Sequence, residues 1–211
     1  MNLRRIFVNA LTFARLPLIF AWMVLAIVAE VEGDWHLAAW GGVFMGLSGI
    51  TDLFDGYLAR KWNVVSELGK LADPLMDKVF YLCAFPTLIW LIARQAESPV
   101  HALVMLVFTV LYLLRDMWVT FLRTVGATQG AEVGAMWLGK VRTALSFPGA
   151  GYVYAYLALH RLAPASCWGA WLDSCFAVEA LLIVLTLWSL VTYTRSYWPY
   201  LKKALDISRK I

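Results

Sequence analysis

The 211-residue sequence predicts an all-α integral membrane protein with six transmembrane helices and both termini in the cytoplasm. Three observations support this fold class: 62% of the residues are hydrophobic, six segments are apolar and long enough to cross a bilayer, and Lys and Arg gather on one side of them. At this length we expect one domain. It would comprise a juxtamembrane segment (1–11), a six-span bundle (12–195) and a basic cytoplasmic tail (196–211).

The predicted spans are stretches of about 20 or more predominantly apolar residues. They cover residues 12–31, 37–58, 75–94, 100–124, 138–159 and 174–195. Aromatic residues make up 15% of the chain, which suits the aromatic belts at the two membrane interfaces. Glu30 and Glu32 follow the first apolar segment where a cleavage site would need small residues, so we expect that segment to remain in the protein.

The distribution of Lys and Arg predicts the orientation. Only Arg94 and Arg161 fall on one side of the predicted spans, and the other 16 of the 18 Lys and Arg residues fall on the opposite side. Since cytoplasmic loops carry the excess of these residues, both termini and the loop after residue 58 are expected in the cytoplasm. The net charge of +4 therefore reflects membrane topology, and no nucleic-acid partner is expected.

The first residues mix basic and apolar side chains, which favours either a short interfacial helix over residues 1–11 or a solvated tail. Asn9 and Thr12 are residue types that cap helices, so we expect them to begin the first helix. Arg15 is expected to extend toward phosphate groups at the membrane surface.

Four aspartates flank the loop between the second and third predicted spans. Asp52 and Asp55 lie one helical turn apart and share a face, and Asp73 and Asp77 do the same. Asp73 precedes Pro74, a pair that is typical of an N-cap and the first helical residue, so the third helix is expected to start there. Carboxylates that converge from two helices repel one another unless cations or protons are present.

Ionised aspartates in a membrane protein are costly and mark functional sites. One alternative is that these aspartates form ordinary salt bridges with neighbouring basic residues, namely Arg60, Lys70 and Lys78. Hard oxygen ligands favour Mg²⁺ or Mn²⁺ shared with substrate phosphates, and two such ions can clamp both oxygens of a phosphoryl displacement. The sequence therefore predicts a site for two divalent ions.

Small and basic residues accompany the aspartates. Gly56 and Ala59 share the helix face of Asp52 and offer small surfaces against which a base or a phosphate can lie. Arg60 follows at the cytoplasmic end, where it is suited to bidentate contact with a phosphate.

This pattern resembles the signature of the CDP-alcohol phosphatidyltransferase family. All eight signature positions match: Asp52, Asp55, Gly56, Ala59, Arg60, Gly69, Asp73 and Asp77. The resemblance implies a homodimer with two metal ions on Asp52, Asp55, Asp73 and Asp77, and with Asp77 as the catalytic base. It also implies that a CDP-linked lipid binds at Asp55, Gly56, Ala59, Arg60 and Gly69.

A second group of basic residues, Arg115, Arg123, Lys140 and Arg142, predicts a pocket for the phosphate of an anionic acceptor. The alternative is that they only anchor the protein at the cytoplasmic surface. The runs around them, and the start of the chain, are similar to phosphatidylglycerophosphate synthases, which commonly carry Lys in place of Arg142. That similarity implies transfer of a phosphatidyl group from CDP-diacylglycerol to glycerol 3-phosphate, at the cytoplasmic face of a bacterial inner membrane.

Other functions stay open at this point. The acceptor alcohol could instead be phosphatidylglycerol, inositol phosphate or serine, although the basic group favours a phosphorylated acceptor over serine. A cation transporter would also place carboxylates among helices, but nearer the bilayer midplane. An inactive lipid-binding relative is a further alternative, against which the complete set of four aspartates argues.

Overall fold

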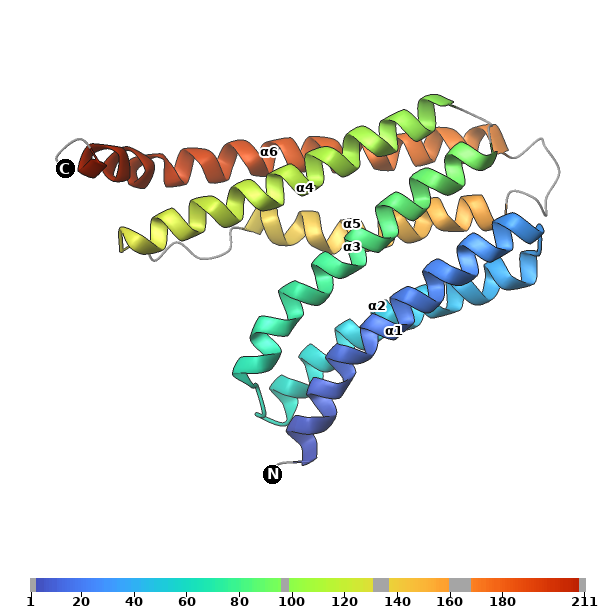
Figure 1. Cartoon of the computed structure of the whole chain (residues 1–211), viewed down its shortest axis with the longest axis horizontal. Helices are drawn as coiled ribbons and strands as arrows, with labels where there is room; N and C mark the ends of the chain where they lie inside the picture. Colours follow the sequence, from blue (N-terminus) through green and yellow to red (C-terminus); the bar gives the residue numbers. More distant parts are fainter. Residues whose placement is uncertain (1–2, 96–98, 131–136, 160–167, 209–211) are drawn as a thin grey trace. The chain divides into compact units, whose positions relative to one another are not determined.

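The computed structural model describes residues 3–95, 99–130, 137–159 and 168–208. All regular structure within these ranges is helical, which confirms the predicted all-α class (Figure 1). The helices are α1 (Leu3–Glu32), α2 (Trp35–Lys61), α3 (Glu67–Gln95), α4 (Pro99–Thr128), α5 (Trp137–Leu159) and α6 (Trp168–Ser208).

Five of these helices are long and apolar enough to cross a membrane, as expected for an integral membrane protein. They are α1, α2, α3, α4 and the Gly169–Leu205 part of α6. Helix α5 covers the remaining predicted span and is not among these five. The count of six spans, and the side on which the termini lie, stay predictions.

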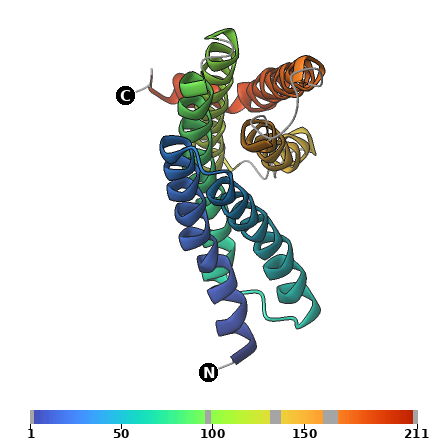
Figure 2. The same ribbon diagram turned by 90° about the vertical axis from the view of Figure 1, so that its right-hand side faces the viewer.

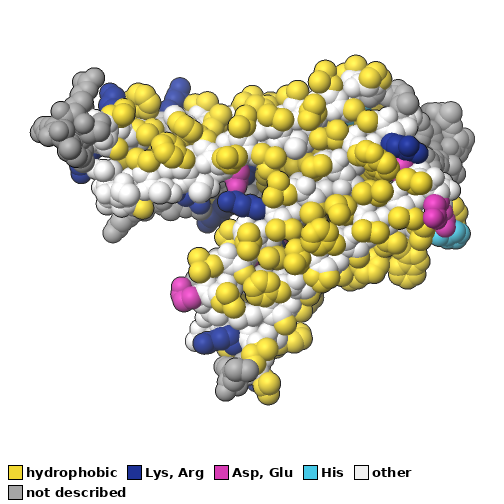
Figure 3. Space-filling model, in the orientation of Figure 1, with side chains coloured by type: hydrophobic (Ala, Val, Ile, Leu, Met, Phe, Trp, Pro, Cys, Tyr) yellow, Lys and Arg dark blue, Asp and Glu magenta, His cyan; other side chains and the backbone are white. Residues whose placement is uncertain are grey.

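The outer surfaces of the first helices are apolar. Phe13, Phe20 and Val24 of α1 are 41–53% exposed, and Leu75 and Leu82 of α3 are 53–55% exposed. Hydrophobic side chains cover most of the visible surface over α1 and α3 in Figure 3. Since exposed apolar area of this extent is unfavourable in water, we interpret it as the surface that contacts lipid.

Helix α1 has a buried stripe whose members are separated alternately by four and three residues, so they share one face. The stripe consists of Val8, Thr12, Arg15, Ile19, Trp22, Ala26 and Ala29. This face packs against both α2 and α3, with α1 and α2 running side by side in both ribbon views (Figures 1 and 2). Thr12 and Arg15 are its polar members, and they reach the predicted metal ligands.

The chain divides into two compact units. The first contains residues 1–102 and 150–172, and the second contains residues 103–149 and 173–211. The acidic residues of the predicted metal site belong to the first unit, and the basic residues of the predicted acceptor pocket belong to the second.

The predicted start of the first helix was wrong. Helix α1 already begins at Leu3 and continues unbroken into the first span, so Asn9 and Thr12 lie inside it and cap nothing. The segment 3–11 is therefore helical but is not a separate interfacial helix. Helix α6 runs to Ser208 and so includes most of the predicted tail, whose cytoplasmic position stays a prediction.

The start of the third helix was also predicted wrongly. Helix α3 begins at Glu67 rather than at Asp73 and Pro74. The Ser66 hydroxyl accepts a hydrogen bond of 2.9 Å from the Gly69 amide, which is the geometry of an N-cap residue. Ser66 thus caps the Gly69 amide in the first turn of α3. The Asp73 carboxylate is not needed as a cap and instead contacts Arg15.

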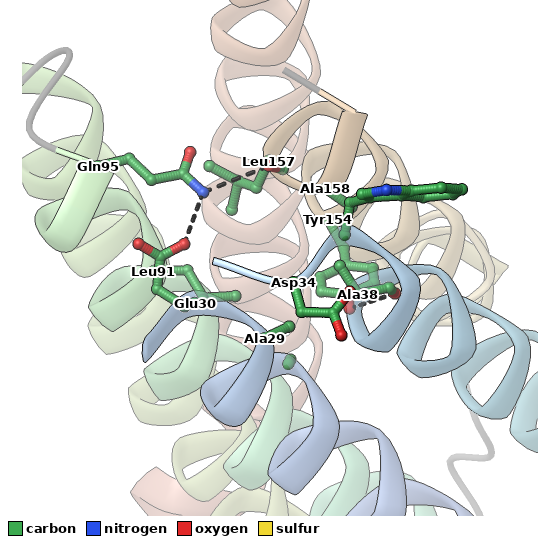
Figure 4. Close-up of a pocket in the computed structure, with 11 residues that line it drawn as sticks. Ala29, Glu30, Asp34, Ala38, Leu91, Gln95, Tyr154, Leu157 and Ala158 are labelled. Carbon is green, nitrogen blue, oxygen red and sulfur yellow. Dashed lines mark hydrogen bonds between the residues drawn. The ribbon is translucent and has the colours of Figure 1, made fainter. Parts of the chain in front are cut away.

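Hydrogen bonds tie the C-terminal end of α1 to its neighbours around a small pocket (Figure 4). The Gln95 side-chain amide donates to the Glu30 carboxylate at 3.1 Å and to the Leu157 carbonyl at 3.3 Å, which joins α1, α3 and α5. The Tyr154 hydroxyl donates to the Ala38 carbonyl at 2.8 Å and adds α2. These contacts fix one end of the first unit, whereas the aspartates lie beside the N-terminal half of α1.

Candidate metal and phosphate sites

The four predicted metal ligands surround the guanidinium of Arg15. Its Nη1 lies 2.6 Å from Asp52 Oδ1 and 3.2 Å from Asp77 Oδ1. Its Nη2 lies 3.3 Å from Asp55 Oδ2 and also contacts Asp73 Oδ1. Arg15 therefore faces the carboxylates rather than the membrane surface, contrary to the sequence-based prediction. A single cation between four carboxylates offsets much of their mutual repulsion.

The carboxylates that α2 and α3 supply differ in their exposure to solvent. Asp52 and Asp55 come from successive turns of α2, and Asp73 and Asp77 from successive turns of α3. The Asp55 side chain is only 6% exposed, whereas that of Asp73 is 56% exposed. The cluster is thus closed beneath Asp55 and open at Asp73, so a ligand can approach it from one side.

Thr12 completes the buried part of the cluster. Its hydroxyl donates a hydrogen bond of 2.7 Å to Asp55 Oδ2, one helical turn before Arg15 on α1. Sequence reasoning did not place Thr12 or Arg15 in the site. The signal that could have found them is their position: two polar residues three apart in a stripe that is otherwise apolar.

The donor set fits a divalent metal ion. One carboxylate oxygen from each of Asp52, Asp55 and Asp73 lies within 4.8 Å of the others. Hard oxygen ligands at such separations are those that Mg²⁺ and Mn²⁺ use. Asp77 is not part of this group of three, although it shares Arg15 with it. The residues can therefore hold a metal, while the second ion and the metal's identity stay predictions.

Two of the residues expected to contact the CDP-linked lipid lie next to each other. A Cβ built on Gly56 would sit 3.5 Å from Nη1 of Arg60, so the exposed guanidinium folds back over the glycine one turn earlier. Ala59 is half-buried beside them. This arrangement puts a guanidinium beside two small residues one turn from Asp52 and Asp55, where it can contact a phosphate.

Gly69 has a local packing role. A Cβ at this position would lie 3.0 Å from the Ser66 hydroxyl and 3.4 Å from the Asn9 side-chain oxygen. Ser66 in turn donates a hydrogen bond of 2.7 Å to Asn9, which joins the start of α3 to α1. The absence of a side chain at Gly69 thus permits the cap and this contact, and its role in binding the CDP-linked lipid stays a prediction.

In the second unit, the predicted acceptor residues divide into two groups. Arg115 and Arg142 are 5% and 1% exposed, whereas Arg123 and Lys140 are exposed. The Asp116 carboxylate lies 3.6 Å from Arg115 and 3.4 Å from Arg142, so it pairs with both buried guanidiniums. Arg115 and Arg142 are thus linked through Asp116, and Lys140 lies at the exposed start of α5.

Tyrosines that the sequence did not single out pack against these arginines. The Arg142 guanidinium lies 3.9 Å from the ring centroid of Tyr112. Arg115 and Arg123 lie 4.9 Å and 5.4 Å from the ring centroid of Tyr193, whose hydroxyl accepts a hydrogen bond of 3.0 Å from Arg123. These are cation–π distances. Ser189, one turn before Tyr193 on α6, accepts a hydrogen bond of 2.5 Å from Arg115.

Some of the buried guanidinium nitrogens have no hydrogen-bond partner among the described residues. They are Nε of Arg115 and both Nε and Nη1 of Arg142. Buried charged donors without partners are costly, and a bound anion would satisfy them.

The chain belongs to the CDP-alcohol phosphatidyltransferase family, because the sequence model of that family matches residues 5–192. The match spans both units and includes every sequence-predicted residue of the two candidate sites. The resemblance drawn from the aspartate pattern is therefore confirmed.

Relatives of known name agree with this assignment. The chain is 34% identical to a Treponema pallidum protein, and the alignment covers 75% of this chain and 70% of the relative. It is 32% identical to a Bacillus subtilis protein, and that alignment covers 64% of this chain and 69% of the relative. Both are named CDP-diacylglycerol–glycerol-3-phosphate 3-phosphatidyltransferase. A Streptomyces coelicolor protein named cardiolipin synthase (CMP-forming) is 40% identical over 39% of this chain, which spans only 38% of that relative.

Proposed function

We propose that the protein transfers the phosphatidyl group of CDP-diacylglycerol to glycerol 3-phosphate and releases CMP. The observation that carries the proposal is the convergence of oxygens from Asp52, Asp55 and Asp73 within 4.8 Å of one another, inside the family's signature. The names of the Treponema and Bacillus relatives support the choice of both substrates.

The aspartates would hold two Mg²⁺ or Mn²⁺ ions, with Asp52, Asp55 and Asp73 as the core of the ligand set and Asp77 at its edge. When bound, such ions neutralise the pyrophosphate of the donor lipid and stabilise the leaving CMP. Arg15 already balances part of the carboxylate charge from α1. Gly56, Ala59 and Arg60 would receive the cytidine and phosphate groups, and Gly69 would keep the start of α3 close to α1.

Asp77 is the proposed general base. Its side chain is 39% exposed, so a substrate hydroxyl can reach it. It would take the proton of a glycerol 3-phosphate hydroxyl as that oxygen forms a bond to the lipid-side phosphorus. The bond between this phosphorus and the CMP oxygen then breaks, and CMP leaves with the electron pair. Such a base contributes about 10²–10⁴-fold to the rate.

Arg115, Arg123, Lys140 and Arg142 are the proposed site for the acceptor's phosphate. The burial of Arg115 and Arg142 argues against simple surface anchoring, because an anchoring side chain extends its charge to the membrane interface. Their unpartnered nitrogens are donors that a phosphate monoester can use.

The proposed setting is a bacterial inner membrane, with the site on the cytoplasmic face and the protein as a homodimer. The excess of Lys and Arg on one side of the spans supports the orientation, and the bacterial relatives support the membrane. The site would then face the aqueous pool from which glycerol 3-phosphate comes.

A second candidate is cardiolipin synthesis, in which phosphatidylglycerol is the acceptor. The Streptomyces relative favours it, but the alignment covers a minority of both chains. A phosphodiester also offers fewer charges to the arginine group than a phosphate monoester does.

Two substitutions of matched chemistry test the role of the base. Asp77→Asn should lower CMP release by at least about 10²-fold, because asparagine cannot accept the proton. Asp34→Asn is the control, since Asp34 caps α2 and asparagine caps equally well. Unaltered CMP release by Asp77→Asn would contradict the assignment.

The acceptor site is tested by Arg123→Ala, which should raise the KM for glycerol 3-phosphate while the KM for CDP-diacylglycerol stays the same. Arg94→Ala removes an exposed arginine, which stacks on Trp90, and should change neither value. An unchanged acceptor KM in Arg123→Ala would argue against the basic pocket.

A further inference from the structure

We infer that Tyr193 is a positioning residue of the acceptor site, which holds Arg115 and Arg123 in the orientation that binds the acceptor's phosphate. The inference rests on the proposed function and adds to it a residue outside the basic group. Tyr193 would not contact the reacting atoms, because it is 1% exposed and acts through the two arginines.

Tyr193 makes two kinds of contact with the arginines. Its ring lies under both guanidiniums, with 4.9 Å to Arg115 and 5.4 Å to Arg123. Its hydroxyl accepts the 3.0 Å hydrogen bond from Nη2 of Arg123. The ring face offsets part of the repulsion between two cations that converge on one side chain, and the hydroxyl fixes the direction of the Arg123 fork.

Neighbouring side chains pack closely around the tyrosine ring. Its ring stacks on Tyr197 with an interplanar angle of 11°, and both belong to a buried cluster with Val119 and Leu122. On the other side, a Cβ at Gly139 would lie 3.0 Å from the Tyr193 hydroxyl and 3.1 Å from Nη2 of Arg115. The ring is thus held between α4, α5 and α6, as preorganised binding requires.

The donors that remain free point to an anion as the ligand. Arg115 uses Nη2 on Ser189 and Nη1 on Asp116, which leaves Nε without a partner among the described residues. Arg142 uses Nη2 on Asp116 and has two buried nitrogens left. A rigid, planar donor set of this kind suits a phosphate better than a flexible lysine would.

Tyr193→Phe in the full-length protein in detergent is the direct test, because it keeps the ring and removes the hydroxyl. The KM for glycerol 3-phosphate should rise about tenfold, the lower end of what a hydrogen bond to a charged group contributes. The KM for CDP-diacylglycerol and kcat should stay within about twofold. Tyr200→Phe makes the same chemical change at a half-buried tyrosine of the same cluster and should be silent.

A double substitution separates positioning from general stability. If the hydroxyl acts through Arg123, Tyr193→Phe combined with Arg123→Ala should match Arg123→Ala alone within about twofold. Thermal stabilisation by glycerol 3-phosphate without the donor lipid gives a readout independent of turnover, and Tyr193→Phe should reduce it. Additive effects, or unchanged KM and stabilisation in Tyr193→Phe, would overturn the inference. Wild-type protein that releases no CMP with glycerol 3-phosphate would instead overturn the proposed function.

Discussion

Arg15 and Asp52 form an ion pair in which Nη1 and Oδ1 are 2.6 Å apart, and the same guanidinium reaches the other three aspartates of the signature. A cation from α1 is thus built into a site that α2 and α3 supply with carboxylates. This explains how four acidic groups fold together at one place. It also implies that part of the charge balance of the cluster belongs to the protein itself.

Arg15→Gln should lower stability most when divalent ions are absent. Removing one partner of a buried ion pair costs roughly 3 kcal/mol or more, and here it leaves several carboxylates facing one another. Mg²⁺ should restore part of the loss, because the ion can take over the charge balance. Thermal unfolding in detergent with EDTA and with Mg²⁺ measures both effects. Arg94→Gln, at an exposed arginine, is the control. An equal loss with and without Mg²⁺ would contradict this account.

Thr12→Val should destabilise the protein by about 1.5–3 kcal/mol, because it removes the hydroxyl that donates to the buried Asp55 carboxylate without changing the side-chain volume. Thr120→Val is the matched control, since Thr120 is exposed on α4 and, among the described residues, its hydroxyl bonds to the Asp116 carbonyl of the same helix. Denaturation midpoints of the two variants give the comparison. If both shift equally, the hydrogen bond to Asp55 does not carry the effect.

Ser66→Ala should cost about 1 kcal/mol and loosen the start of α3, because Ser66 is its N-cap. Hydrogen exchange at the Gly69 amide should become faster, whereas Ser66→Thr should preserve protection. Unchanged exchange in Ser66→Ala would mean that another residue caps the helix.

Gly139→Ala should weaken acceptor binding, because the new methyl group would press on the Tyr193 hydroxyl and on Arg115 at 3.0–3.1 Å. Gly151→Ala on the same helix has no atom within 4 Å of its new Cβ and should leave binding intact. The acceptor KM of each variant decides the matter. Similar values in the two variants would show that the close approach at Gly139 has no effect on the site.

The sequence was sufficient for the positions of the helices. The predicted span 37–58 lies inside α2 and 100–124 lies inside α4, because apolar composition over about 20 residues determines where a chain crosses lipid. The helix ends were less predictable, since they depend on single hydrogen bonds. Asp73 and Pro74 have the composition of a helix start, but Ser66 meets the Gly69 amide and starts α3 earlier.

For the site, the spacing of the aspartates predicted which faces carry them, because helix geometry fixes that relation. The partners could not be predicted in the same way. Arg15 is 58 residues from Asp73 in the chain, and Tyr193 is 70 residues from Arg123. Such contacts arise from packing between helices. They cannot be predicted from the composition of one helix or from the spacing of residues within it.

The central claim is the identity of the reaction, and CMP release by the purified protein in detergent tests it most directly. The assay would contain CDP-diacylglycerol and Mg²⁺ or Mn²⁺, with glycerol 3-phosphate, phosphatidylglycerol, inositol phosphate and serine supplied singly. The account predicts turnover with glycerol 3-phosphate and none with the other three acceptors. Turnover with another acceptor alone, or with none of the four, would contradict it.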